Sequence, residues 1–342
     1  MAGHARGVSV SLEVSTVDYH CAGEPFRIVT EGVSPLRGET ILEKRRDAAA
    51  RLDDVRRLLV NEPRGHADMY GCFVTEPGDD GAALGVVFFH NEGYSTACGH
   101  GTIALVTWAL ESGRLPAVEP ETEMIVDVPS GRLKCVARCE GGRVRSVRFR
   151  NVPSFVLAQD VTIATSHGPL TLDVAYGGAF YATLDAREHG LTLDPNRLPE
   201  LIVLQRELRA AIDAQLDVVH PLEPELNGIY GVVFFEDEAA GPPLTQRNVA
   251  VFANGGVDRS PCGSGTSARL AVLHAQRKLA AGDELRHLSV VDTEFRGRIV
   301  AVTEVAGRPA VVTEVEGAAH LTGRHTFVLD ERDPLGTGFL LR

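Results

Sequence analysis

The sequence predicts an α+β fold made of two similar halves, with mostly antiparallel sheets. Short strand-like segments bounded by Gly-rich turns fill most of the chain, and only four stretches have helical character. Because long strand-rich stretches separate those helices, a doubly wound parallel sheet is disfavoured. A Cys-Gly-x-Gly-Thr motif begins at Cys98 and again at Cys262, 164 residues later in a chain of 342. A repeat at half the chain length indicates an internal duplication.

The individual elements follow from local patterns. Val147 and Phe149 alternate with arginines after a Glu-Gly-Gly turn, as in a half-buried strand. RIVAVTEV and AVVTEVEG flank a short turn at 306–309, which predicts a hairpin. We expect two domains, 1–155 and 156–342, with the last strands crossing back to the first half. The predicted helices cover residues 41–60, about 100–112, about 197–216 and about 264–280.

Composition narrows the class of partner. The 46 acidic residues outnumber the 34 lysines and arginines, giving a formal net charge of -12. This balance argues against a nucleic-acid or anionic-membrane partner, since both require a basic surface. The segment MAGHARGVSVSLEV lacks the apolar core of a signal peptide, and no apolar run approaches the ~18 residues of a membrane span. We expect a cytoplasmic enzyme or binding protein.

The six cysteines do not suggest a disulfide framework or a metal site. They are scattered through a long, apolar-rich chain, so we expect reduced thiols. No CxxC pair, HExxH motif or clustered Cys/His set occurs, so no metal is expected. The cysteines are Cys21, Cys72, Cys98, Cys135, Cys139 and Cys262.

The repeated motif has a direct chemical interpretation. Its glycines allow a tight turn and close approach of a ligand, and each motif opens a helix whose first N–H groups are unpaired. Those groups can bind a carboxylate or phosphate, and they stabilise a thiolate, which would lower the cysteine pKa from about 8.5. The helix after Cys98 is apolar on all sides, which predicts a helix buried inside a sheet or barrel. It would deliver Cys98 to a cleft between the halves.

Other interpretations of the motif stay open. A single cysteine before a helix is most often a small buried hydrophobe, but the recurrence of Gly and Thr at the same offsets favours function for Cys98 and Cys262. A protein that only binds a small amino or imino acid would need the carboxylate cradle but not two cysteines. Phosphate binding is weakly supported, because neither loop has the lysine or spacing of a phosphate-binding loop.

Five segments of the chain have a distinctive wording. They are HCAGEPFRIV (20–29), NEPRGHADMYG (61–71), NEGYSTACGHGTIAL (91–105), AYGGAFYA (175–182) and DRSPCGSGTSARLAVLHA (258–275). These segments resemble the proline racemase family, which includes proline racemases, hydroxyproline 2-epimerases and trans-3-hydroxy-L-proline dehydratases. The resemblance runs from about residue 10 to about residue 335.

The resemblance implies a fold and a mechanism. Each half would be a curved, barrel-like sheet around a central helix, as in diaminopimelate epimerase, with the active site between the halves. No cofactor is implied. In racemases and epimerases of the family, one cysteine thiolate removes the α-proton and a second cysteine thiol reprotonates the opposite face. Those residues would be Cys98 and Cys262 here. The implied partner is a small imino acid, and family members are often homodimers.

The resemblance also implies substrate contacts. Gly99, His100, Gly263 and Ser264 would bind the substrate carboxylate, largely through backbone N–H groups. Asp258 would face the ring nitrogen, and Phe252 would lie against the apolar face of the substrate. Each has a structural alternative: Asp258 could cap the turn before Ser260, Phe252 could belong to the core, and His100 could be a buried histidine bonded to a carbonyl.

The choice among family members depends on position 262. In the dehydratase branch the second cysteine is typically threonine, because elimination needs proton removal on one face only. Cys262 therefore favours a racemase or epimerase acting on proline or a hydroxyproline. The segments NEGYSTACGHG and VVHPLEPELNGIYG are nearer to the dehydratase branch, so a trans-3-hydroxy-L-proline dehydratase with Cys98 as base is the alternative. Diaminopimelate epimerase shares the two-cysteine layout, but the motifs favour proline racemase relatives.

Overall fold

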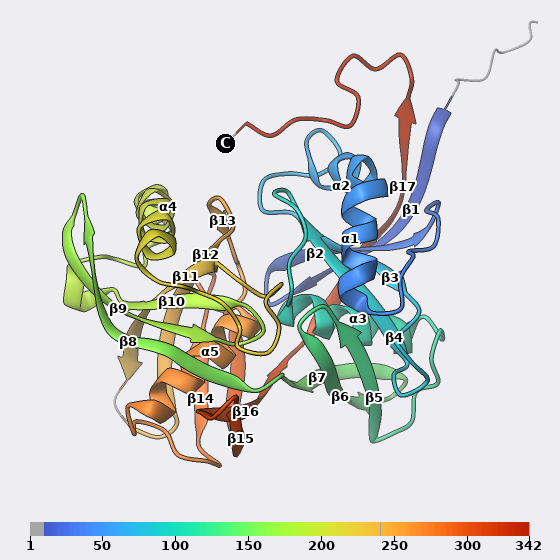
Figure 1. Cartoon of the computed structure of the whole chain (residues 1–342). Coiled ribbons are helices and arrows are strands. Elements are labelled where there is room, and N and C mark those ends of the chain that lie inside the picture. Colours follow the sequence, from blue (N-terminus) through green and yellow to red (C-terminus); the bar gives the residue numbers. More distant parts are fainter. Residues whose placement is uncertain (1–9, 240, 342) are drawn as a thin grey trace, which may run out of the picture.

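The computed structural model describes residues 10–239 and 241–341 (Figure 1). The first nine residues, which begin the N-terminal stretch considered above, lie outside this range. The strands of the described chain form one continuous hydrogen-bonded network of seventeen members. Figure 1 shows that this network is bent into two curved sheets lying side by side, one for each half. The predicted two-half α+β fold is confirmed.

The first half is built around helix α3 (Gly99–Glu111). Helices α1 (Ile41–Arg51) and α2 (Asp53–Val60) cover its outer side near β4. Its strands are β1 (Val10–Cys21), β2 (Glu24–Glu31), β3 (Tyr70–Thr75), β4 (Leu84–His90), β5 (Glu121–Val128), β6 (Gly131–Glu140), β7 (Arg143–Arg150) and, from the end of the chain, β17 (Ala319–Asp330).

The second half is built in the same way around helix α5 (Gly263–Ala275), with α4 (Leu198–Gln215) outside. Two short 3-10 turns, Arg187–His189 and Pro195–Arg197, precede α4. Its strands are β8 (Ser154–Thr165), β9 (Gly168–Tyr176), β10 (Phe180–Asp185), β11 (Ile229–Ala239), β12 (Leu244–Phe252), β13 (Gly256–Val257), β14 (Glu284–Leu288), β15 (Glu294–Val305) and β16 (Arg308–Gly317).

The two halves pair their strands in the same order and sense. The first runs β17-β1-β2-β3-β4-β5-β6-β7, and only the β2/β3 and β4/β5 pairs are parallel. The second runs β8-β9-β10-β11-β12-β14-β15-β16, with parallel pairs at the equivalent places, β10/β11 and β12/β14. The shared pattern supports the internal duplication indicated by the motif. Strand β17 completes the first half by pairing with β1.

Each central helix is enclosed by the strands of its own half. Every α3 residue from Gly99 to Leu110 is buried, and the helix packs on β1, β2, β7 and β17. Helix α5 is buried from Gly263 to Leu273 and packs on β8, β9, β15 and β16. A helix buried on all sides has no continuous polar face, which explains the sequence of α3. Helix α5 is also enclosed, but it buries polar groups as well, among them Arg269.

The sequence expectations for the helices differ from the structure in two places. The expected helix 41–60 is interrupted at Leu52, which ends α1 and precedes α2. The expected helix 264–280 ends at Ala275, because the chain turns at Arg277, whose φ is +59°. The hairpin of β15 and β16 and the strand β7 lie where predicted.

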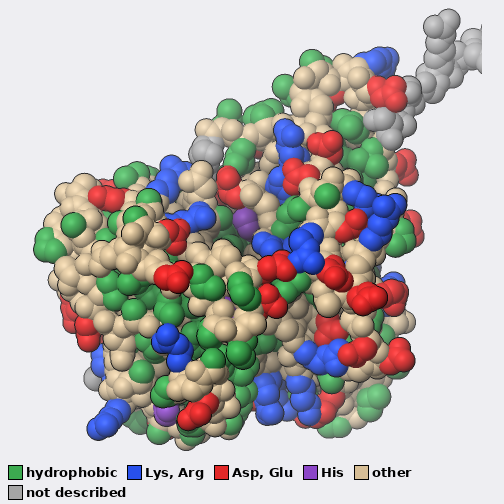
Figure 2. Space-filling model, viewed as in Figure 1, with side chains coloured by type: hydrophobic (Ala, Val, Ile, Leu, Met, Phe, Trp, Pro, Cys, Tyr) green, Lys and Arg blue, Asp and Glu red, His purple; other side chains and the backbone are tan. Residues whose placement is uncertain are grey.

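The distribution of surface charge and the length of the helices bear on whether the protein binds nucleic acid or crosses a membrane. Figure 2 shows acidic and basic side chains intermixed on the displayed face, without a broad basic area. Among the described residues, no helix combines the length and apolarity required to cross a bilayer.

Candidate active site

The N-termini of the two central helices meet between the halves. A Cβ atom added to Gly99 would lie 2.6 Å from Gly263 Cα, and one added to Gly263 would lie 2.7 Å from Gly99 Cα. Glycine is therefore required at both positions, because any side chain would push the helices apart. The preceding residues, Cys98 and Cys262, are brought to the same place, and each is about 5% exposed.

Cys98 caps helix α3 and lies beside an imidazole. Its Sγ accepts a hydrogen bond from the Gly101 N–H at 3.2 Å, and His100 Nε2 is 3.3 Å away. Burial lowers the pKa of His100 to about 3, so the imidazole is neutral. His100 Nδ1 is 3.9 Å from an Asp258 carboxylate oxygen. The sequence-predicted residues Cys98, His100 and Asp258 are thus brought together.

Cys262 has a different set of neighbours. Its Sγ is 3.5 Å from the Tyr181 hydroxyl and 4.0 Å from Ser264 Oγ, and Tyr181 and Ser264 are 2.8 Å apart. Cys262 has φ +60°, a left-handed conformation that costs a non-glycine residue about 1–3 kcal/mol. Such strain is most often found where a side chain must be aimed at a ligand.

The expectation that the helix ends would lower the cysteine pKa values is wrong. Burial raises the pKa of both thiols well above the ordinary value, and the charge on Asp258 raises them further. The Gly101 and Gly265 N–H groups act in the opposite direction, but they do not outweigh desolvation. Both cysteines are therefore thiols near neutral pH.

Asp258 and Glu24 form a pair of buried carboxyls next to the cysteines. Burial raises the pKa of Asp258 to about 6, although hydrogen bonds from the Ser260 N–H and hydroxyl, at 2.8 and 2.7 Å, lower it in part. Those bonds use Oδ1, which caps the turn, whereas Oδ2 faces His100. Glu24 accepts from the Arg259 N–H at 2.6 Å, and burial raises its pKa. A cation bound beside these carboxyls would stabilise their charged forms, so the site favours a positively charged group.

Anion-binding groups lie at the same point. Within the described chain, the N–H groups of Gly99, His100, Gly263 and Ser264 have no hydrogen-bond acceptor. The positive ends of two helix dipoles therefore converge where these donors are free, which suits a carboxylate. An anion site beside a cation site matches an amino-acid zwitterion.

Aromatic rings form the remaining wall. Phe252 stacks on Tyr230 at 5.8 Å between ring centroids, and Tyr70 is 5.7 Å from Phe252 and 5.0 Å from His100. The hydroxyls of Tyr70 and Tyr230 are 2.8 Å apart. Sequence reasoning selected Phe252 and missed both tyrosines. A signal was present, because a Tyr-Gly pair begins β3 at Tyr70 and another lies one residue into the equivalent strand β11 at Tyr230.

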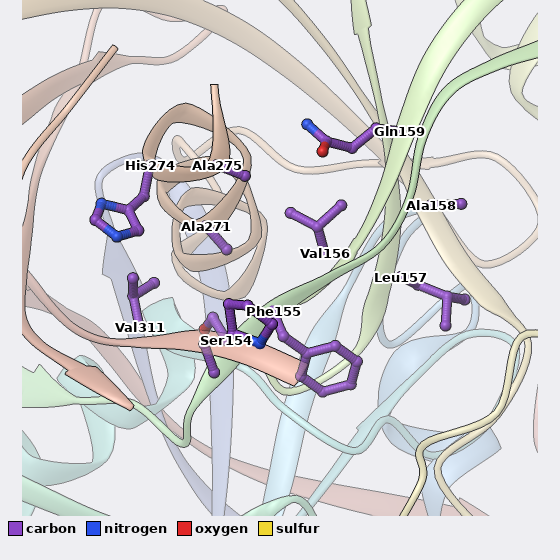
Figure 3. Close-up of a pocket in the computed structure, with 12 residues that line it drawn as sticks. Ser154, Phe155, Val156, Leu157, Ala158, Gln159, Ala271, His274, Ala275 and Val311 are labelled. Atoms are coloured by element: carbon purple, nitrogen blue, oxygen red, sulfur yellow. The ribbon is translucent and has the colours of Figure 1, made fainter. Parts of the chain in front are cut away.

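Two cavities differ in their relation to this site. A cavity of about 350 Å³ between the halves is lined by Ser95, Thr96 and Tyr230 together with Arg45 and Arg209, and it shares Tyr230 with the aromatic wall of the site. An apolar cavity of about 270 Å³ lies elsewhere, at the C-terminal end of α5 (Figure 3). Its nearest helix residue to Cys262 is Ala271, about 14 Å further along at 1.5 Å per residue. It has no part in the cysteine site.

The other cysteines and possible metal ligands lie apart from this arrangement. All six cysteines are free, as expected, and all six are buried. Within residues 10–239 and 241–341, no group of three or more His, Cys, Asp or Glu side chains is arranged to bind a metal ion.

The fold and the site together define a protein of two duplicated α+β halves, each presenting one cysteine at the N-terminus of a buried helix. The chain belongs to the proline racemase family, because the model described as proline racemase matches residues 16–340.

Curated relatives are similar over nearly the whole chain. It is 45% identical over 334 residues to a trans-3-hydroxy-L-proline dehydratase from Bacillus thuringiensis subsp. konkukian, covering 98% of this chain and 100% of that one. It is 46% identical over 336 residues, with the same coverage, to a 3-hydroxyproline 2-epimerase from Burkholderia multivorans.

Solved structures agree on the fold. A hydroxyproline epimerase from Agrobacterium vitis with bound trans-4-hydroxy-L-proline is similar with a TM-score of 0.90 and 34% identity, covering 97% of this chain and 96% of that one. A methylitaconate-delta-isomerase shares the fold, with a TM-score of 0.56 and 12% identity over 94% of this chain and 97% of that one.

Proposed function

We propose that this protein inverts C2 of a hydroxyproline by proton transfer between two cysteines, Cys98 and Cys262. The observation that carries the proposal is that both thiols flank one point where free N–H groups and a buried carboxylate, Asp258, converge. That set of groups accommodates a carboxylate, an ammonium and a C2–H bond between two acid-base groups.

The charges of the substrate activate the cysteines. The substrate carboxylate binds the N–H groups at the two helix ends, and the ring ammonium binds Asp258 Oδ2. Burial is the main cause of the raised thiol pKa values, and the charge on Asp258 adds to it. The ammonium offsets the part that is due to Asp258, which favours release of one thiol proton to solvent and leaves that cysteine as a thiolate. It takes the C2 proton, and the thiol on the other face supplies a new one. The helix dipoles stabilise the charge that spreads into the carboxylate during the transfer.

The names of the relatives favour a substrate hydroxylated at C3. Inversion of trans-3-hydroxy-L-proline at C2 breaks one C2–H bond toward the first cysteine and forms another from the second, giving cis-3-hydroxy-D-proline. The net composition does not change.

Dehydration is the second candidate, because several relatives at 45–47% identity are named trans-3-hydroxy-L-proline dehydratases. In this substrate the 3-hydroxyl lies on the same ring face as the C2 hydrogen. The cysteine that takes the C2 proton can therefore return it to the departing hydroxyl. C2–H and C3–O break, C2=C3 forms, and water leaves. We favour inversion because Cys262 places an acid on the opposite face, where the resemblance gives dehydratases a threonine.

Product analysis tests the proposal. Purified protein is incubated separately with trans-3-hydroxy-L-proline, trans-4-hydroxy-L-proline and L-proline, and the products are followed by proton NMR in deuterated water. We expect the C2 epimer of a hydroxyproline, deuterated at C2. Formation of a pyrroline carboxylate without epimer would replace inversion by dehydration, and no turnover of any of the three would refute both.

A further inference from the structure

The duplicated halves give their cysteines different partners. The first motif has His100 two residues after its cysteine, whereas the second has Ser264 at the equivalent place. His100 Nε2 is 3.3 Å from Cys98 Sγ, but Ser264 Oγ is 4.0 Å from Cys262 Sγ. Serine is too short to reach the sulfur as the imidazole does, so the second cysteine needs another polar neighbour.

Tyr181 supplies that neighbour from strand β10. It is 1% exposed, and its hydroxyl is 3.5 Å from Cys262 Sγ and 2.8 Å from Ser264 Oγ. Strand β10 takes the place in the second half that β2 takes in the first. There Phe26 lies 5.7 Å from His100 between ring centroids and has no hydroxyl. The second cysteine thus has a phenol and a serine as polar neighbours, whereas the first has an imidazole with a phenyl ring beside it.

We propose that Tyr181 is a positioning residue for Cys262, whose hydroxyl, held by Ser264, stabilises the thiolate form of that cysteine alone. This assignment rests on the proposed function for the role of the thiolate. The hydrogen bonds reverse as Cys262 titrates. The thiol S–H donates to the Tyr181 oxygen, whereas the thiolate accepts the Tyr181 O–H, and Ser264 then donates to the phenol oxygen. No proton leaves Tyr181.

The test is the rate at which each cysteine is alkylated. A hydrogen bond to a charged acceptor changes an equilibrium by about ten- to a hundredfold, and the 3.5 Å separation puts this one at the lower end. Loss of the hydroxyl in Tyr181→Phe should lower the thiolate fraction of Cys262 about tenfold. Since a more basic thiolate is also more nucleophilic, the alkylation rate should fall about three- to tenfold.

Iodoacetamide labelling between pH 7 and 9, followed by peptide mass spectrometry, measures the alkylation rates of Cys98 and Cys262 separately. In Tyr181→Phe we expect Cys262 to react more slowly at every pH while the rate at Cys98 changes less than about twofold. Each titratable neighbour of Cys262 other than Tyr181 is unaltered by this substitution: Asp258 before α5, Cys98 at the start of α3 and Tyr230 on β11.

Tyr176→Phe is the matched control. Tyr176 lies on the adjacent strand β9, is 1% exposed, and its hydroxyl has no hydrogen-bond partner in the described chain. The Tyr176→Phe substitution should leave the alkylation rates of Cys98 and Cys262 unchanged. Ser264→Ala provides a second variant. It removes the hydroxyl that holds the phenol, together with the 4.0 Å contact of that hydroxyl with Cys262 Sγ, and it should slow Cys262 but not Cys98.

An unchanged Cys262 rate in Tyr181→Phe, an equal slowing of both cysteines, or slowing by Tyr176→Phe would overturn the assignment. If Tyr181→Phe does not fold, an unchanged Cys262 rate in Ser264→Ala has the same consequence. Labelling needs no substrate, so its outcome is separate from that of the product analysis.

Discussion

Replacing Gly99 by alanine perturbs the contact on which the site depends. The new methyl group would lie 2.6 Å from Gly263 Cα, where ordinary contacts begin at about 3.4 Å. The obstacle is backbone, so the helix N-termini must separate by nearly 1 Å. A displacement of about 1 Å between reacting groups lowers a rate by about a hundredfold. Overpacking of a buried site also costs about 1–3 kcal/mol of folding free energy.

The assay measures kcat/KM for the best hydroxyproline together with the midpoint of thermal unfolding. Gly99→Ala should lose about a hundredfold in kcat/KM, and Gly263→Ala should lose as much, because its Cβ would lie 2.7 Å from Gly99 Cα. Gly78→Ala is the control, since its nearest neighbours would be 3.6 Å away. Wild-type kcat/KM in Gly99→Ala would refute the close approach of the two helices.

Further predictions concern the charge and the packing of the site. Burial raises the pKa of Asp258 to about 6, so kcat/KM should rise with pH through that value as the carboxylate forms, and Asp258→Asn should abolish this step in the pH profile. Because the pKa of Asp258 in the folded state lies above its value in the unfolded chain, ionisation of this carboxyl lowers the free energy of unfolding as pH rises from about 4 to about 6. Asp258→Asn removes that loss, so a lower unfolding temperature for this variant at pH 7 would contradict the sign. Phe149 is 1% exposed and packs against Gly99 and Gly263, so Phe149→Ala should cost about 3–5 kcal/mol in urea unfolding, and a loss below about 1 kcal/mol would show that the contact is unimportant.

The parts of the fold that sequence predicts are those set by local patterns. The repeated Cys-Gly-x-Gly-Thr motif identified both central helices, and the unbroken apolar character of the helix after Cys98 indicated that this helix is enclosed. The single expected helix 41–60 is wrong in one detail, because α1 and α2 meet at Leu52, a change of direction that the continuous helical pattern does not reveal.

The neighbours of the cysteines depend on strand pairing over long separations, which a local pattern cannot show. Tyr181 reaches Cys262 only because β10 pairs with β11 in parallel around α5. Tyr70 and Tyr230 meet across the halves although 160 residues separate them. The error about thiol pKa values has a similar origin. The helix ends were visible in the sequence, whereas the burial that outweighs them is a property of the assembled halves.

The two-cysteine proton transfer is tested most directly with Cys98→Ala and Cys262→Ala on trans-3-hydroxy-L-proline in deuterated water. Proton NMR follows both loss of the C2–H signal and formation of the C2 epimer. We predict that each variant loses epimer formation by at least a hundredfold, while the native protein forms epimer carrying deuterium at C2. Epimer formation at the native rate in either variant would contradict the account. Dehydrated product from Cys262→Ala but not from Cys98→Ala would show that Cys98 alone drives elimination.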